Sequence, residues 1–99
     1  MTANETIRQA LAAAAGEHGT EAHFPWCDLV VIVWRADKKR WGMRGYDLPD
    51  TKRICSDVSK AVRSGAIAFV DRGSIGGPGN RGLNPRRQAV YRLTEKGKA

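Results

Sequence analysis

Apolar residues recur at helical spacing near the start of the chain. The first such segment repeats them at intervals of three and four residues, at Ile7, Ala10, Leu11 and Ala14. Thr2 precedes Glu5 by three residues, which is the spacing of a capping box. We therefore predict a first helix that ends at Gly16, followed by a loop over residues 17–24.

The second apolar segment, residues 29–34 (LVVIVW), is compatible with two structures. Its β-branched residues favour a buried strand. Pro25 and Asp28 instead suit the first turn of a helix, and Gly42 suits its end. On a helical wheel one stripe collects Trp26, Val30, Val33, Trp34 and Trp41. We predict a helix, either buried on several sides or lending apolar surface to a partner.

Residues 51–64 have the clearest helical pattern in the chain. They follow a turn-rich connector, residues 43–50, with Asp50 as the predicted N-cap and Gly65 as the predicted end. One face is apolar, through Ile54, Val58, Ala61 and Val62. The opposite face is basic and rich in hydroxyl groups, with Asp57 at its boundary: Lys52, Arg53, Ser56, Ser59, Lys60 and Arg63.

The period then changes from helical to alternating. Residues 66–72 and 88–93 alternate as strands do, and the second run places Ala89, Tyr91 and Leu93 on one face. Between them, residues 73–87 are rich in Gly, Pro, Asn and Arg, so we predict a hairpin with an extended loop. Thr94 is expected to cap a last helical turn.

Charge is unevenly distributed along the 99 residues. Residues 1–28 hold one basic and four acidic side chains, a balance of −3, whereas residues 29–99 hold sixteen and six, a balance of +10. Such segregation is typical of proteins with a polyanionic partner, most often nucleic acid. The length suits one domain. With two unpatterned cysteines, no export signal and no membrane-length apolar run, we expect a cytoplasmic protein without a membrane association.

Two stretches resemble the winged helix-turn-helix superfamily of bacterial regulators. SKAVRSGAIAFVDR, residues 59–72, is similar to the transition from recognition helix to wing, and Tyr91, Leu93, Thr94 and Gly97 match a Y-x-L-T-x-x-G ending. The resemblance covers roughly residues 4–97 and implies an α+β fold: a three-helix winged helix-turn-helix with a C-terminal β-hairpin wing. Residues 1–99 would be a single winged-helix domain, frayed at 1–3 and 98–99, with a flexible wing loop at 73–87. The connector before residue 51 is longer than the family's tight turn.

The resemblance also implies a site and a function. Helix 51–64 would enter the DNA major groove, with Arg53 and Arg63 on guanine and Lys52 and Lys60 on phosphates. Ser56 and Ser59 would donate to either. The wing, residues 72–87, would follow the backbone or a minor groove through Arg72, Arg81, Arg86 and Arg87. The expected function is sequence-dependent binding of double-stranded DNA by a small transcriptional regulator or a phage or plasmid accessory protein.

Other chemistries find less support in the sequence. Gly77, Gly79 and Gly82 match G-x-G-x-x-G, but a strand follows instead of the helix that a dinucleotide site requires. His23 and Cys27 lack an orienting third group, so we expect no enzyme and no small-molecule substrate. Four residues offer metal-ligand atoms without compact spacing, and Cys55 borders the core stripe and is expected to be buried: His18, His23, Cys27 and Cys55. We expect neither metal nor cofactor.

The alternative function is a winged-helix module for protein or RNA contacts. In that case Val31, Ile32 and the tryptophans would form the partner surface, and the basic face would be incidental. A homodimer or a protein partner is compatible with either reading.

Overall fold

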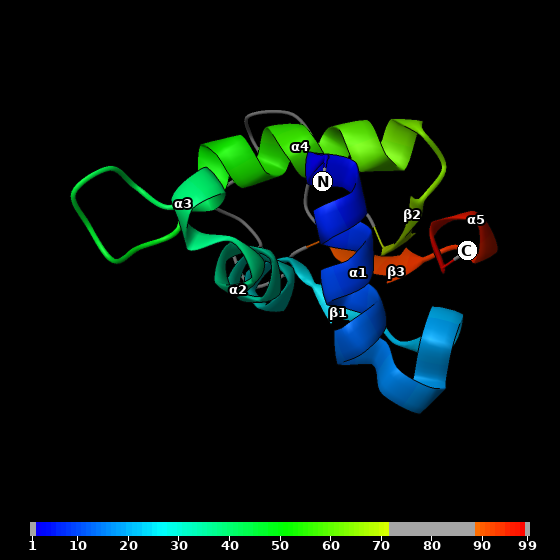
Figure 1. Cartoon of the computed structure of the whole chain (residues 1–99). Coiled ribbons are helices and arrows are strands. Elements are labelled where there is room, and N and C mark those ends of the chain that lie inside the picture. The colour runs from blue at the N-terminus through cyan, green and yellow to red at the C-terminus, as the bar shows by residue number, and fades with distance from the viewer. Residues whose placement is uncertain (1, 72–88, 99) are drawn as a thin grey trace, which may run out of the picture.

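The computed structural model describes residues 2–71 and 89–98 (Figure 1). Along the chain the elements are α1 (Ala3–Ala15), the 3₁₀ segment η1 (Gly16–Glu21), β1 (Phe24–Pro25), α2 (Trp26–Ala36), α3 (Lys38–Trp41), α4 (Thr51–Arg63), β2 (Ile67–Asp71), β3 (Val90–Leu93) and α5 (Glu95–Lys98). The α+β class predicted from the sequence is therefore confirmed. No helix among these residues is long and apolar enough to cross a membrane.

The start of α1 follows the predicted capping box. The Glu5 amide donates to Thr2 Oγ1 at 3.2 Å, and the helix begins at Ala3. Gly16 ends the helix with a φ of 55°, a left-handed conformation that glycine adopts without steric cost. The buried stripe is Ile7, Leu11 and Ala15, while the predicted Ala14 is exposed.

Residues 17–24, predicted as a loop, contain short elements of regular structure. The 3₁₀ segment η1 follows α1 directly, and β1 pairs with β3 through Phe24 opposite Tyr91. A strand of two residues is too short to show alternation in the sequence. Its backbone partners also come from the far end of the chain, where no local pattern can indicate them. The Trp26 amide continues this contact by donating to the Ala89 carbonyl at 2.8 Å, just where α2 begins.

The second apolar segment is a helix, as predicted, but it does not run to Gly42. Asp37 leaves the helical conformation, with φ −154° and ψ 86°, and its carboxylate accepts a hydrogen bond from the Arg40 amide at 3.1 Å. Asp37 is thus the N-cap of the short helix α3. The break turns Trp41 out of the stripe that it was expected to share with Trp26 and Trp34, and Trp41 becomes fully buried.

Helix α4 agrees closely with its prediction. The Arg53 amide donates to Asp50 Oδ1 at 3.2 Å, which makes Asp50 the N-cap. The buried residues are Ile54, Val58 and Ala61, and the predicted Val62 is half-buried. After the helix, Gly65 has a φ of 86° and turns the chain into β2.

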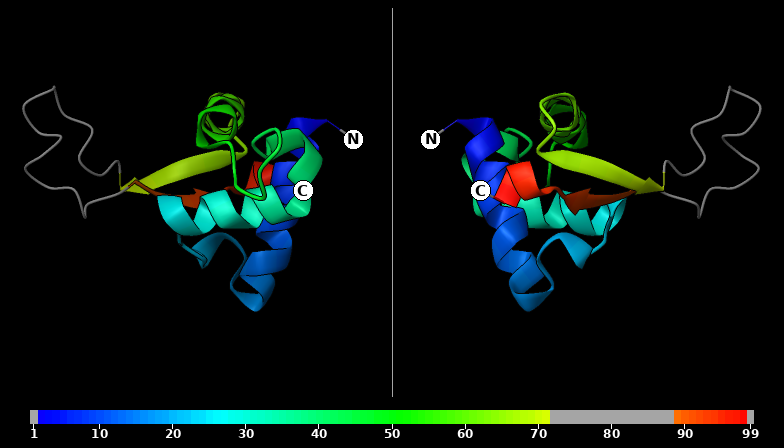
Figure 2. Two further views of the ribbon diagram at one scale, coloured as in Figure 1. Left: turned by 90° about the vertical axis from the view of Figure 1, so that its left-hand side faces the viewer. Right: turned by 90° about the vertical axis from the view of Figure 1, so that its right-hand side faces the viewer.

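The predicted hairpin is confirmed, and β1 extends it to a three-stranded antiparallel sheet within the described residues, in the order β1-β3-β2. Ile67 lies opposite Leu93 and Phe69 opposite Tyr91, after which a bulge shifts the register before Asp71. Tyr91 contacts the rings of Phe69 and Trp26, at centroid distances of 4.9 and 6.0 Å. The hairpin extends to one side of the helices, below α4 (Figure 2).

The hydrophobic core joins α1, α2 and α4 to the base of the hairpin. Its members without exposed surface are Ile7, Leu11, Leu29, Val33, Trp41, Ile54, Ala61 and Leu93. Thr94 caps the last turn as predicted, because its Oγ1 accepts from the Gly97 amide at 3.1 Å. Arg8 on α1 donates to the Gly97 carbonyl at 2.9 Å, so the C-terminal turn is held against the first helix.

The buried Trp41 generates a stability prediction. Its Nε1 donates to Asp57 Oδ2 at 2.8 Å, which joins α3 to α4. We expect Trp41→Phe to lower the free energy of unfolding by about 1–3 kcal/mol, because the hydrogen bond to a carboxylate is lost. Trp41→Ala should cost about 3–5 kcal/mol, because it also leaves a cavity. Urea denaturation followed by far-UV circular dichroism measures both.

Trp26→Phe is the matched control for this prediction. Trp26 is half-buried, and no described group accepts a hydrogen bond from its indole nitrogen. The same chemical change should therefore cost less there. An equal loss of stability in Trp26→Phe and Trp41→Phe would contradict the role given to the Trp41–Asp57 bond.

Candidate nucleic-acid interface

The outward face of α4 carries the residues that the sequence singled out. At 100° per residue they fall within an arc of about 120°, directly opposite the buried stripe. Five of the six are exposed: Lys52, Arg53, Ser56, Lys60 and Arg63. Ser59 differs, since it is half-buried on the edge of α4 that faces the sheet. The structure thus brings together the predicted residues of this helix on one surface.

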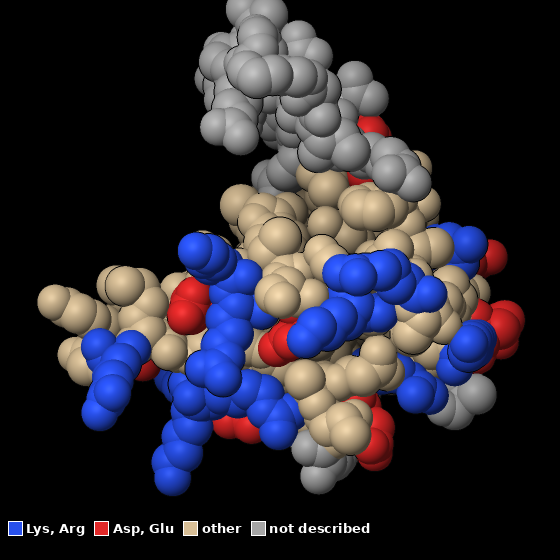
Figure 3. Space-filling model, turned by 90° about the horizontal axis from the view of Figure 1, so that it is seen from above, with Lys and Arg blue, Asp and Glu red and all other residues tan. Residues whose placement is uncertain are grey.

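The cations of this face have no ion pairs within the described ranges. The ion pairs found there join Lys38 to Asp47 at 3.6 Å and Arg40 to Asp37 at 3.8 Å, both near α3. The four basic side chains of α4 are left to attract an external anion. Figure 3, which looks down on this face, shows Lys and Arg side chains gathered across it.

The neighbouring carboxylates are occupied by structural contacts. Asp57 accepts the Trp41 hydrogen bond, and Asp50 caps the helix through the Arg53 amide. Asp37 caps α3. Residues 38–63 contain eight basic and three acidic side chains, a balance of +5. This segment therefore carries a net positive charge, and its three carboxylates contact the protein's own donors.

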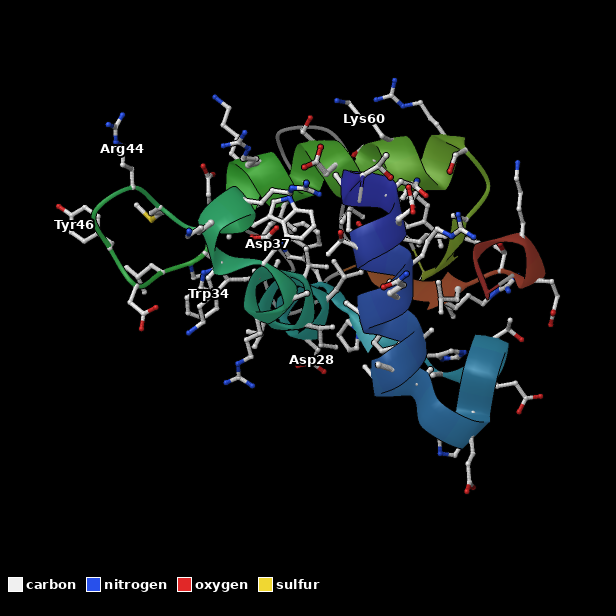
Figure 4. All side chains as sticks on the ribbon, viewed as in Figure 1. Asp28, Trp34, Asp37, Arg44, Tyr46 and Lys60 are labelled. Atoms are coloured by element: carbon white, nitrogen blue, oxygen red, sulfur yellow. The ribbon has the colours of Figure 1, made fainter. Side chains whose placement is uncertain are left out.

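Helix α3 and the following connector add basic residues that the sequence analysis did not assign to the site. Lys39 and Arg44 are exposed, while Lys38 Nζ lies 4.7 Å from the Trp34 ring centroid and Arg40 lies 5.5 Å from that of Trp41. Arg44 and Lys60 point to the same side of the molecule, away from Asp28 (Figure 4). The signal for this extension was the run KKR directly after Asp37, which reads as an N-cap followed by basic residues.

The predicted wing residues Arg72, Arg81, Arg86 and Arg87 lie outside the described residues, as do the glycines of the G-x-G-x-x-G match. The strands that lead to the wing are described. Beside them, α4 and the sheet enclose an open hollow of about 210 Å³, lined by Val58, Ser59, Val62, Arg63, Phe69 and Tyr91. Burial, with a smaller contribution from Cys55, raises the pKa of the Tyr91 hydroxyl above its usual value. Tyr91 is therefore uncharged at neutral pH and adds no negative charge beside Arg63.

Other candidate chemistries gain no geometry from the fold. The described residues contain no group of three or more His, Cys, Asp or Glu that could hold a metal ion. His23 is exposed before β1, whereas Cys27 lies in the first turn of α2. The expected burial of Cys55 is wrong: its side chain is exposed, because its position on α4 lies to the side of the core stripe.

Comparisons of the chain with protein-family models, with curated proteins and with solved structures found no significant match. The basic face of α4 is therefore interpreted from its own geometry and charge.

Proposed function

We propose that this chain is a winged-helix protein that binds double-stranded DNA, with α4 in the major groove and the β2–β3 hairpin against the backbone or the minor groove. The observation that carries the proposal is the outward face of α4, whose cations have no ion pairs in the described part of the chain while the adjacent carboxylates are bound internally. A small transcriptional regulator or a phage or plasmid accessory protein fits this activity.

The arrangement of the elements supports the winged-helix part of the proposal. A strand between the first two helices, a basic third long helix and an antiparallel hairpin directly after it suit the fold that the sequence resembles. Helix α4, with 13 residues, is about 20 Å long. The major groove of B-DNA is about 12 Å wide and admits such a helix with its basic face towards the base edges.

Each basic residue of α4 then has a role set by its chemistry. Arg53 and Arg63 present the planar fork that binds guanine O6 and N7, and Lys52 and Lys60 supply point charges to phosphates. Ser56 donates to a phosphate or a base. Ser59 is half-buried, so it has a smaller part than the sequence suggested.

The alternative of a protein or RNA module receives less support from the fold. Of the surface expected for a protein partner, Trp41 is buried, and Ile32, Trp26 and Trp34 pack against the core, which leaves Val31 exposed at 37%. Duplex RNA has a deep and narrow major groove that a helix does not enter. Competition between DNA and RNA duplexes of the same sequence separates these readings, and equal competition by RNA would favour the alternative.

Binding to DNA should depend steeply on salt. If about six phosphates are neutralised, the logarithm of the affinity should fall against the logarithm of the salt concentration with a slope of about −5. Fluorescence anisotropy of a labelled mixed-sequence duplex, titrated at several salt concentrations, measures this slope. If the protein does not bind duplex DNA at low salt, the proposed function is wrong.

Substitutions on α4 should separate base reading from phosphate binding. On a duplex selected from a random pool, Arg53→Ala and Arg63→Ala should each cost about 1–3 kcal/mol of discrimination against mixed sequence. Lys60→Ala should weaken binding to both duplexes equally and reduce the salt slope by about one.

The control for these variants is Arg35→Ala, which removes an exposed positive charge from the side of α2 opposite its buried residues. This variant should change the affinity for DNA and the discrimination between duplexes less than the α4 variants do. If the α4 variants bind both duplexes as the wild type does, the assignment of the site to α4 is wrong.

A further inference from the structure

The connector between α3 and α4 is a closed and internally bonded loop. Gly42 and Pro49 form a β-bridge at its base, the Met43 amide donates to the Leu48 carbonyl at 2.8 Å, and the Tyr46 amide donates to the Met43 carbonyl at 3.0 Å. This loop, residues 42–50, projects beyond the N-terminal end of α4 (Figure 1). The loop backbone is therefore formed before any partner arrives, and it sets the positions from which the side chains project.

The loop exposes apolar side chains that the core does not cover. Tyr46 is 68% exposed, Leu48 53% and Met43 43%, and these are the largest values among the exposed large apolar residues of the described chain. A rigid tip that presents several large apolar side chains is a common feature of interaction surfaces. The exposure alone does not identify the partner. The charged side chains around the loop indicate its chemical class.

An open hollow of about 340 Å³ lies between this loop and the first turn of α4, and Met43, Arg44, Tyr46, Pro49, Asp50, Thr51 and Lys52 line it. Its walls combine an aromatic ring with aliphatic carbon, and its two cations have no ion pair in the described ranges. The acidic groups nearby are engaged, since Asp50 caps α4 and Asp47 contacts Lys38. The hollow therefore suits a ligand that is anionic in part and weakly polar in part.

We propose that the loop of residues 42–50 and this hollow bind the sugar–phosphate backbone of the DNA strand that borders the groove occupied by α4. The backbone alternates anionic phosphates with deoxyribose, whose carbon faces are only weakly polar. Arg44 and Lys52 contact phosphates, and the Tyr46 ring packs against a sugar. This inference rests on the proposed function, because it extends the same interface by a third contact element.

Continuity with the α4 surface favours DNA over a protein partner. Lys52 belongs both to the hollow and to the basic face of α4, and Arg44 points to the side on which Lys60 lies (Figure 4). A duplex seated on α4 therefore passes over the hollow, where its phosphates meet two further cations. An acidic protein would match the charge, but it would compete with the DNA for Lys52.

Contacts to phosphate and sugar carry no sequence information. The loop should thus raise affinity for every duplex by the same factor and fix the orientation of α4 in the groove. Loss of the loop contact is expected to leave the ratio between selected and mixed sequences unchanged, in contrast to loss of Arg53 or Arg63.

Two exposed substitutions test the proposal, and Arg35→Ala, on the side of α2 opposite its buried residues, is the charge-matched control. Arg44→Ala should lower the affinity for both duplexes by about threefold to tenfold and reduce the salt slope by about one. Tyr46→Ala should lower the affinity of both duplexes without changing the slope, because it removes no charge. Urea midpoints equal to that of the wild type show that both variants are folded.

The outcomes distinguish this proposal from the one on which it rests. If the wild type binds duplex DNA while Arg44→Ala and Tyr46→Ala bind like Arg35→Ala, the loop proposal is overturned and the proposed function stands. If the wild type does not bind duplex DNA, both are overturned. A change of sedimentation mass in Tyr46→Ala with unchanged DNA affinity would assign the loop to contacts between copies of the chain, which also overturns the proposal.

Discussion

The burial of Trp41 is the constraint on which the rest of this structure depends. Its side chain is completely enclosed, its Nε1 donates to Asp57 on α4, and its carbonyl accepts from the Asp50 amide at 2.6 Å. Trp41 therefore joins the end of α3 to the middle of α4 through its indole, and to the base of the 42–50 loop through its backbone carbonyl. Since Asp50 is also the N-cap, the position at which α4 begins is tied to the packing of this one residue.

The same contacts shape the charge of the surface. Asp57 accepts a hydrogen bond from the Trp41 indole, and Asp37 accepts one from the Arg40 amide. These carboxylates are therefore directed towards donors of the protein itself. The basic side chains of α4 have no such role in the fold. Packing thus separates the charges of residues 38–63, so that a segment of mixed composition presents a positive face.

The sequence predicted those helices and strands whose caps, apolar stripes and turns all lie within the element or directly beside it. Helix α4 was predictable because its cap, its apolar stripe and its glycine stop all lie within 16 residues, 50–65. The hairpin was predictable from its alternation and the turn-rich tract between its strands. Strand β1 was not, because Phe24 is paired by Tyr91, and the break at Asp37 was not, because an unbroken helical wheel also places Trp41 on an apolar stripe.

The sequence by itself determined that one helix carries a basic face opposite an apolar one, since helical periodicity assigns residues 51–64 to faces whatever surrounds them. Tertiary structure alone decided that Trp41 would engage Asp57 and where the 42–50 loop would stand. The contact between Trp41 and Asp57 joins residues 16 positions apart on different helices, and no local pattern specifies that distance. Exposed Arg44 and Tyr46 acquire a place beside α4 only through that packing, because the loop itself contributes no side chain to the core.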